Sequence, residues 1–173
     1  MMAGRPSEHT DLQARSLLAV DLGIRTGLAL FGKDGRLSWY RSQNFGNRNR
    51  LKRGVQNILD ACPELIAVVC EGGGSLMTIW EREAAKRRIL FQSVAAQTWR
   101  EDLLLPRDRR DAAAAKRKAL LLARQVIEWS GAPRPTALRH DAAEAILVGF
   151  WSVVDLGWLE APPGWPDRLT QGS

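Results

Sequence analysis

Four carboxylates stand at the ends of apolar segments, where acidic side chains can gather at one edge of a sheet. Asp21 ends the apolar run LLAVD, and Glu71 follows the run LIAVVC directly before three glycines. Asp141 and Glu144 are three residues apart at the start of an apolar segment, so on a helix they project from one face. Burying an isolated carboxylate is costly, so each of these acids needs a compensating partner.

Each acid also has an ordinary structural explanation. Asp21 could form a turn before Gly23, and Glu71 could be a surface residue that begins a loop. Asp141 and Glu144 have the spacing of a capping box. The segment AILVGFWSVV that follows them is apolar nearly all round, which indicates a helix packed against the sheet. Its first turn would then lie beside the strand ends that carry the other two acids.

Carboxylates that converge on one point repel one another and need positive charge between them. Two Mg²⁺ ions, which Mn²⁺ can replace, would supply that charge, because hard cations prefer oxygen ligands. A pair of ions about 3.5–4 Å apart can stabilise the attacking and leaving oxygens of a phosphodiester. Cys62 and Cys70 lack the spacing of zinc ligands, and we expect both to be reduced and mostly buried.

Short apolar runs and longer helical periodicities alternate along the chain. Three strands joined by tight turns predict an antiparallel meander, and the later alternation of helices and strands implies parallel pairing. We expect strands at 17–21, 27–31, 37–43, 65–70 and 89–95, and helices beginning near 51 and spanning 76–88, 111–129 and 141–155. This order predicts an α/β protein of the RNase H-like class, in which helices flank a mixed five-stranded sheet.

The length of 173 residues fits one domain, and seven tryptophans with 45% hydrophobic residues indicate a packed core. We expect a flexible N-terminus over 1–16, one RNase H-like domain over 17–156 and an irregular tail over 157–173 that wraps Trp158 and Trp165 against the domain. The N-terminal residues lack the apolar core of a secretory signal, and no run approaches the roughly 20 apolar residues of a membrane span. We therefore expect a cytoplasmic protein with no membrane contact.

Basic side chains are in excess and gather in three clusters. The net charge of +6 favours a polyanionic partner such as nucleic acid. The clusters are Arg36, Arg41, Arg48, Arg50, Lys52 and Arg53; then Arg82, Lys86, Arg87 and Arg88; then Arg107, Arg109, Arg110, Lys116, Arg117 and Lys118. Although such clusters are often only solvated helix faces, three of them beside acidic strand ends favour contact with a phosphate backbone.

Four segments together resemble the RuvC-like Holliday junction resolvases. LLAVDLGIRTGLALF is similar to their first hairpin, AVVCEGGG to their second acidic strand, and HDAAEAILVGFW to their closing HDxxDA helix. Between these segments, VAAQTWREDLL followed by AKRKALLLAR is similar to the strand-loop-helix that carries a basic residue near the scissile phosphate. The resemblance covers about residues 17–154.

This resemblance implies a metal-dependent, structure-selective endonuclease that acts on branched DNA, with four-way junctions as its substrate. It implies that the catalytic residues and metal ligands are Asp21, Glu71, Asp141 and Glu144. It further implies that Lys118, or less favourably Lys116, positions the phosphate. Because a four-way junction must be cut on two strands, it also implies a homodimer. We expect the interface to involve the apolar positions of helix 76–88 or the exposed face of helix 111–129.

The sequence departs from the family pattern at two places. Glu144 stands where the family more often has Asp, which lengthens the ligand arm by one methylene. Three glycines follow Glu71 in place of an aromatic-containing loop that enters the junction, so Met77 or Trp80 would have to take that part. His140 could tune a metal ligand or touch a phosphate, but a residue without chemistry is the simpler interpretation.

Other functions remain open at this point. The same fold could serve a nuclease that acts on RNA or in transposition, or a non-catalytic nucleic-acid-binding module. The segment DLGIRTG also matches the phosphate turn of sugar kinases and actin-like ATPases. Those proteins close two such domains over a nucleotide, whereas this chain has room for one. A binding module would not need four converging acids, which favours the nuclease.

Overall fold

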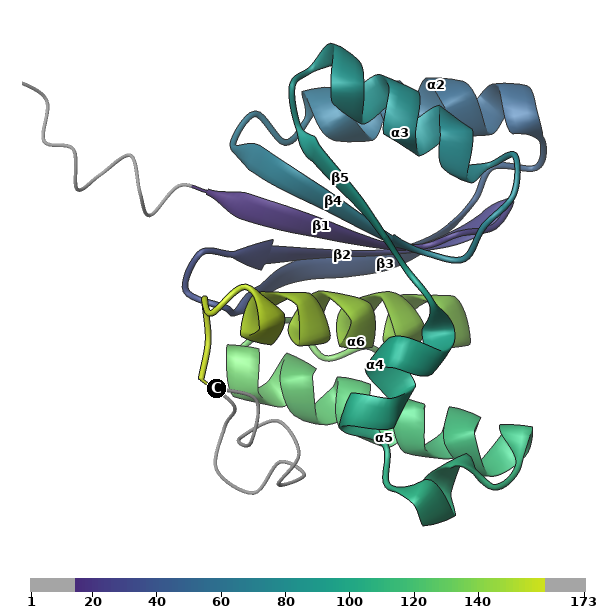
Figure 1. The fold of residues 1–173 in the computed structure, drawn as a ribbon, viewed down its shortest axis with the longest axis vertical. Coiled ribbons are helices and arrows are strands. Elements are labelled where there is room, and N and C mark those ends of the chain that lie inside the picture. The colour runs from purple at the N-terminus through teal and green to yellow at the C-terminus, as the bar shows by residue number, and fades with distance from the viewer. Residues whose placement is uncertain (1–14, 161–173) are drawn as a thin grey trace, which may run out of the picture.

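Short apolar runs form the strands of one mixed sheet in the computed structural model, which describes residues 15–160 (Figure 1). The strands follow the order β3-β2-β1-β4-β5. They are β1 (Ser16–Asp21), β2 (Arg25–Gly32), β3 (Leu37–Asn44), β4 (Leu65–Glu71) and β5 (Leu90–Val94). The first three pair antiparallel, and β4 pairs parallel with both β1 and β5. The predicted fold class, a meander extended by two parallel strands, is confirmed.

Helices cover both faces of this sheet (Figure 1). On one face lie α2 (Arg48–Asp60) and α3 (Met77–Lys86). Against the other face lies α6 (His140–Asp155), with α5 (Ala112–Ser130) packed outside it. None of the helices described is long and apolar enough to cross a membrane.

The central strand β1 is buried on both faces, and its side chains alternate between two cores. Leu17 and Ala19 belong to the core under α6, whereas Leu18 and Val20 belong to the core under α2 and α3. Gly149 lets α6 lie directly on the sheet, because a Cβ there would stand 2.3 Å from a ring carbon of Phe31. The close fit explains why α6 is apolar nearly all round and fixes where its first turn lies.

One helix was not expected from the sequence. The segment VAAQTWREDLL resembles the strand and loop of the family that precede its basic helix. In this structure its residues Ala96–Leu103 instead form α4, which is followed by the short 3₁₀ turn η1 (Pro106–Arg109). Trp99 and Leu103 lie one turn apart and are both fully buried, so packing against the core stabilises a helix too short to announce itself by periodicity. The expectation of a loop here is wrong.

Element boundaries also differ by a few residues. The helix expected over 76–88 ends at Lys86, and Arg88 then adopts a left-handed backbone with φ of 57°. At the end of the described chain, Trp158 and Leu159 pack against the core, and the ammonium of Lys33 lies 4.4 Å from the Trp158 ring centroid. Trp165, and most of the N-terminus expected to be flexible, lie outside the described residues. Both cysteines are free, and Cys70 is buried, as predicted.

An ion-pair network joins α2 to α3. Glu83 of α3 is only 3% exposed and accepts hydrogen bonds from Lys86 at 2.7 Å, Arg87 at 2.9 Å and Gln56 of α2 at 3.3 Å. Arg87 also binds Asp60 of α2 at 2.7 Å. The hydrogen bond from Lys86 is the largest of several causes that lower the pKa of Glu83 to about 2.

Replacing Glu83 with Gln should therefore destabilise the protein. A carboxylate with a depressed pKa contributes stability above its unfolded pKa of about 4.5 and loses it as pH falls toward 2. Because Lys86 is largely exposed, screening reduces the effect to about 1–2 kcal/mol at pH 7. Urea unfolding of Glu83→Gln should show this loss, and the difference from wild type should shrink between pH 4.5 and pH 2. The exposed Glu81→Gln on the same helix is the control, and an equal loss there would contradict the network.

Candidate active site

Two adjacent parallel strands place the first two acids side by side. Asp21 ends β1 and Glu71 ends β4, and the two are register partners in the sheet. Both follow the alternation that points Leu17 and Ala19 toward α6, so both carboxylates face that helix. The backbone N–H of Leu22 donates to the carbonyl of Glu71 at 3.0 Å, which ties the two strand ends together.

The first turn of α6 reaches these strand ends because β2 carries a glycine there. Gly27 is the cross-strand partner of Asp21, and a Cβ at this position would lie 1.9 Å from the backbone oxygen of Asp141. Any side chain would push α6 away from the sheet. With glycine in place, oxygens of Asp21, Glu71 and Glu144 all lie within 4.8 Å of one another.

Asp141 stands beside this group of three rather than inside it. Its carboxylate accepts a hydrogen bond from the hydroxyl of Ser42 on β3, and the guanidinium of Arg139 lies 4.0 Å away. Its charge still contributes to raising the pKa of Asp21. The capping-box interpretation is wrong, because α6 begins after Arg139 with no side-chain cap.

Burial and mutual repulsion disfavour the charged forms of these acids. Burial, followed by the charges of Glu144, Glu71 and Asp141, raises the pKa of Asp21 to about 8 against the opposing effect of Arg100. Burial and Glu144 also raise the pKa of Glu71. Glu71 is only 8% exposed, which excludes the interpretation as a surface residue.

The site has the donor set and the unsatisfied charge of a cation site. The Oε2 atom of Glu71 is buried and has no hydrogen-bond partner among residues 15–160. The indole N–H of Trp99 lies near enough to lower the pKa of Glu71, but its geometry does not complete a hydrogen bond. An all-oxygen, electron-rich cluster of this kind fits a hard divalent cation such as Mg²⁺ or Mn²⁺.

A basic residue that the sequence analysis missed lies at the site. Arg100 of α4 donates to Glu144 at 2.7 Å, and its guanidinium lies 5.0 Å from the Trp99 ring centroid. It opposes the rise in pKa of both Asp21 and Glu71. The available signal was an arginine within TWRED, inside the segment that resembles the family's basic region. Lys118 lies half-buried on α5 without a hydrogen bond or ion pair to a described residue, and its role stays a prediction.

Comparisons with known proteins found similar folds but no sequence relative. No family model matches, and no curated protein matches by sequence. The structure of Thermus thermophilus RuvC in complex with a Holliday junction substrate aligns with a TM-score of 0.58 at 14% identity, covering 83% of this chain and 96% of that one. A second Thermus thermophilus RuvC structure gives a TM-score of 0.57 at 15% identity, covering 82% of this chain and 96% of that one. The yeast mitochondrial Holliday junction resolvase Ydc2 gives 0.55 at 10% identity, covering 82% and 80%.

The chain has a RuvC-like fold. At these identities the likeness concerns architecture, so the role of each residue must be argued from its own surroundings. The two residues that could replace the aromatic loop of the family, Met77 and Trp80, are such a case. Trp80 is fully buried and is excluded, whereas Met77 is half-buried near the strand end. The glycines after Glu71 form an exposed loop in which Gly72 and Gly74 have positive φ. His140 is exposed at the first position of α6.

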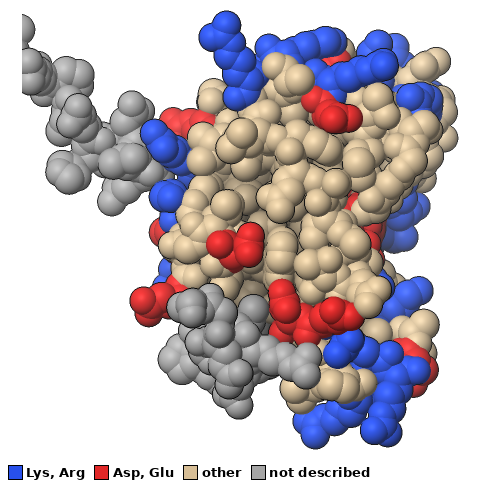
Figure 2. Space-filling model, viewed as in Figure 1, with Lys and Arg blue, Asp and Glu red and all other residues tan. Residues whose placement is uncertain are grey.

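The basic clusters differ in how freely their side chains can reach a ligand. Lys and Arg gather over α2 and α3 at the top of Figure 2 and around η1 and α5 at the bottom, while the strands between them carry little charge. Arg87 is engaged by Glu83 and Asp60, and Arg109 lies 3.8 Å from Glu101. Most other members are exposed. The exposed members are Arg36, Arg41, Arg48, Arg50, Lys52, Arg53, Arg82, Lys86, Arg88, Arg107, Arg110, Lys116 and Arg117.

Replacing Asp21 with Asn should stabilise the metal-free protein at neutral pH. An acid whose folded pKa is raised to about 8 from 3.8 destabilises the fold increasingly as pH rises between those values. Urea unfolding in a chelator should show Asp21→Asn more stable by on the order of 1–3 kcal/mol at pH 8, with the advantage vanishing near pH 4. Glu64→Gln, an exposed change at the other end of β4, should show no such trend. Parallel stability curves for wild type and Asp21→Asn would contradict the raised pKa of Asp21.

Proposed function

We propose that this protein is a divalent-metal-dependent endonuclease that cuts branched DNA, with four-way junctions as its substrate. The observation that carries the proposal is the cluster of Asp21, Glu71 and Glu144, whose oxygens lie within 4.8 Å of one another on a RuvC-like fold. Surplus negative charge held at a strand edge destabilises a protein unless a cation offsets it. A matching structure, that of Thermus thermophilus RuvC, is in complex with a Holliday junction substrate.

The three clustered acids would hold the metal, and Asp141, whose charge acts on Asp21, would complete the site. Two Mg²⁺ ions, or Mn²⁺ in their place, would activate the attacking water and stabilise the leaving oxygen. Asp141 is oriented by Ser42 and is therefore fixed before any ion binds. Glu71 offers an oxygen that no described residue satisfies.

Arg100 is placed to bind a phosphate at the same edge. Its helix α4 is anchored on α6 by the indole of Trp151, which donates to Asp102 at 2.6 Å, so the guanidinium is held beside the acids. A cation bound to Glu144 would share the carboxylate that now pairs with Arg100. The guanidinium of Arg100 could then turn toward the phosphate. Lys118, predicted from the resemblance, would be a second phosphate contact from α5.

A homodimer follows from the proposed substrate, because resolving a four-way junction requires two cuts and one chain supplies one site. The expected apolar stripe on α3 is wrong as an interface, since Ile79, Trp80 and Ala84 are buried in the chain's own core. Leu121 of α5 is 58% exposed and keeps that helix as the candidate surface. Free cysteines agree with the reducing interior of a cell, and we propose a cytoplasmic location.

The alternatives explain less of the site. A non-catalytic binding module gains nothing from buried acids that repel both one another and a phosphate backbone. A nuclease that acts on RNA or in transposition would use the same acids and differs only in substrate. The choice of substrate therefore decides between these functions.

Cleavage of labelled substrates tests the proposal. Four-way junction, flap, duplex and RNA–DNA hybrid should be incubated with Mg²⁺ or Mn²⁺, and the junction should be cut in paired, symmetric positions. Glu71→Gln should lower the cleavage rate by at least about 100-fold, because the metal contributes several kcal/mol, while junction binding persists. Glu64→Gln is the matched control and should cleave normally. Preferential cutting of the hybrid would favour the RNA alternative, and tight binding without any cleavage would favour the binding module.

A further inference from the structure

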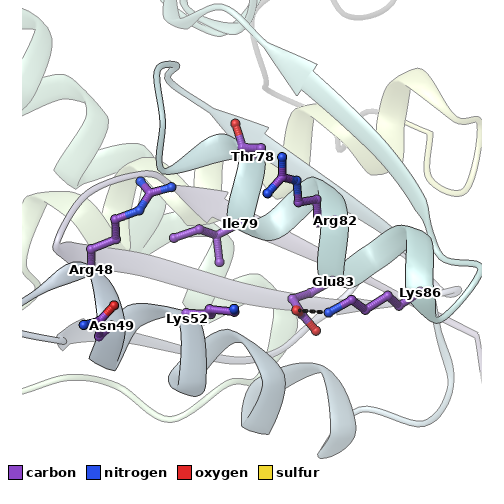
Figure 3. A pocket seen from close by; sticks show the side chains of 8 residues that line it. All are labelled: Arg48, Asn49, Lys52, Thr78, Ile79, Arg82, Glu83 and Lys86. Atoms are coloured by element: carbon purple, nitrogen blue, oxygen red, sulfur yellow. Dashed lines mark hydrogen bonds and ion pairs between the residues drawn. The ribbon is translucent and has the colours of Figure 1, made fainter.

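A groove of about 470 Å³ runs between α2 and α3, on the face of the sheet opposite α6. Arg48 and Lys52 extend into it from α2, and Arg82 and Lys86 line it from α3 (Figure 3). The side chain of Ile79 lies between the two helices and is buried. Four basic side chains from two helices therefore surround one open space.

The positive charge of this groove is largely uncompensated. The only acid among its lining residues is Glu83, which is already paired with Lys86 at 2.7 Å and with Arg87 at 2.9 Å. Lys52 and Arg82 are exposed and make no hydrogen bond or ion pair with any residue from 15 to 160. Two cations on opposite walls of the groove are thus available to an anion.

The groove begins at the edge of the sheet that carries the acids. The helix α2 starts just after β3, which runs in the same direction as β1, and α3 starts just after the loop that follows Glu71. Arg48 donates to the backbone oxygen of Ser75 at 3.0 Å and to its hydroxyl at 2.9 Å, so it connects α2 to that loop. A branched substrate that places one strand at the acids can therefore lay a neighbouring arm in the groove, over this loop.

The spacing of the cations suits a repeating anion better than a single one. Arg48 and Lys52 lie one helical turn apart on α2, and Arg82 and Lys86 lie one turn apart on α3, which separates each pair by about 6 Å along its axis. That separation is comparable to the distance between successive phosphates of a nucleic-acid strand. The N-terminus of α2, with Arg48 as its first residue, adds a partial positive charge at the end nearest the acids.

We propose that the α2–α3 groove binds the sugar-phosphate backbone of an uncut arm of branched DNA, outside the candidate active site. This inference rests on the proposed function, because the arm belongs to the same substrate. The groove would hold the junction against the protein while a different strand lies at the acids. Binding and cleavage would then depend on separate sets of residues.

The test compares two double variants of equal charge change. Lys52→Ala with Arg82→Ala removes the two unpaired cations of the groove, and Arg124→Ala with Arg134→Ala removes two exposed arginines that do not line it. Because Lys52 and Arg82 are exposed and make no hydrogen bond or ion pair with a described residue, thermal melting should be unchanged. Binding of a fluorescein-labelled four-way junction is measured by anisotropy in a chelator over a range of salt concentrations.

The groove variant should bind the junction roughly 10-fold more weakly at moderate salt, and its log–log salt slope should become shallower by about 2, one phosphate for each lost cation. The control variant should match wild type in both. An unchanged affinity and slope in the groove variant would overturn the inference, and so would an equal loss in the control.

These outcomes separate the inference from the proposed function. If wild type cuts no substrate but the groove variant loses affinity and slope, the nuclease proposal fails while the groove remains a nucleic-acid site. If wild type cuts junctions and the groove variant binds as wild type does, the nuclease proposal stands and the groove inference fails.

Discussion

Carboxylates that repel one another are held together here because the first turn of α6 packs onto β2 at Gly27, where no side chain separates the two backbones. Gly27 makes this contact possible beside Asp21, and Gly149 continues it two turns further along the helix toward Phe31. The free energy of burying the apolar faces of α6 therefore offsets the repulsion at its first turn. The properties of the site depend on that contact. They include the buried Oε2 atom of Glu71, which has no hydrogen-bond partner among the described residues, and the raised pKa of Asp21.

The RuvC-like fold also separates the two kinds of charge. The acids face α6 at the ends of β1 and β4, whereas unpaired cations line the helices on the opposite face. A phosphate backbone approaching the acids alone would be repelled, so the proposed nuclease would need cations for chemistry and a separate basic surface for affinity. Arg100 of α4 is a cation at the acids themselves, because its guanidinium pairs with Glu144 and offsets part of the negative charge of the cluster.

The central strands and their acids could be predicted from the sequence. The apolar runs that end on Asp21 and Glu71 indicate buried strands, and the alternation of side chains along a strand shows which face each acid shares with its neighbours. The contacts that complete the site could not be predicted, since they join distant segments. Ser42 meets Asp141 across 99 positions of sequence, and Arg100 reaches Glu144 from a helix of eight residues that tertiary packing stabilises. The prediction that Trp80 could enter the junction was wrong, because its place in the sequence does not show that α3 directs its side chain into the core.

Diffraction from crystals grown with Mn²⁺ tests the central claim most directly, because the anomalous signal locates the ions without reference to any assay. We expect two anomalous peaks among Asp21, Glu71 and Glu144, with Asp141 beside them, and we expect both peaks to weaken or vanish in Glu71→Gln crystals grown in the same way. Crystals of the wild-type protein that bind Mn²⁺ elsewhere, or show no peak at these acids while Arg100 stays paired with Glu144, would contradict the account.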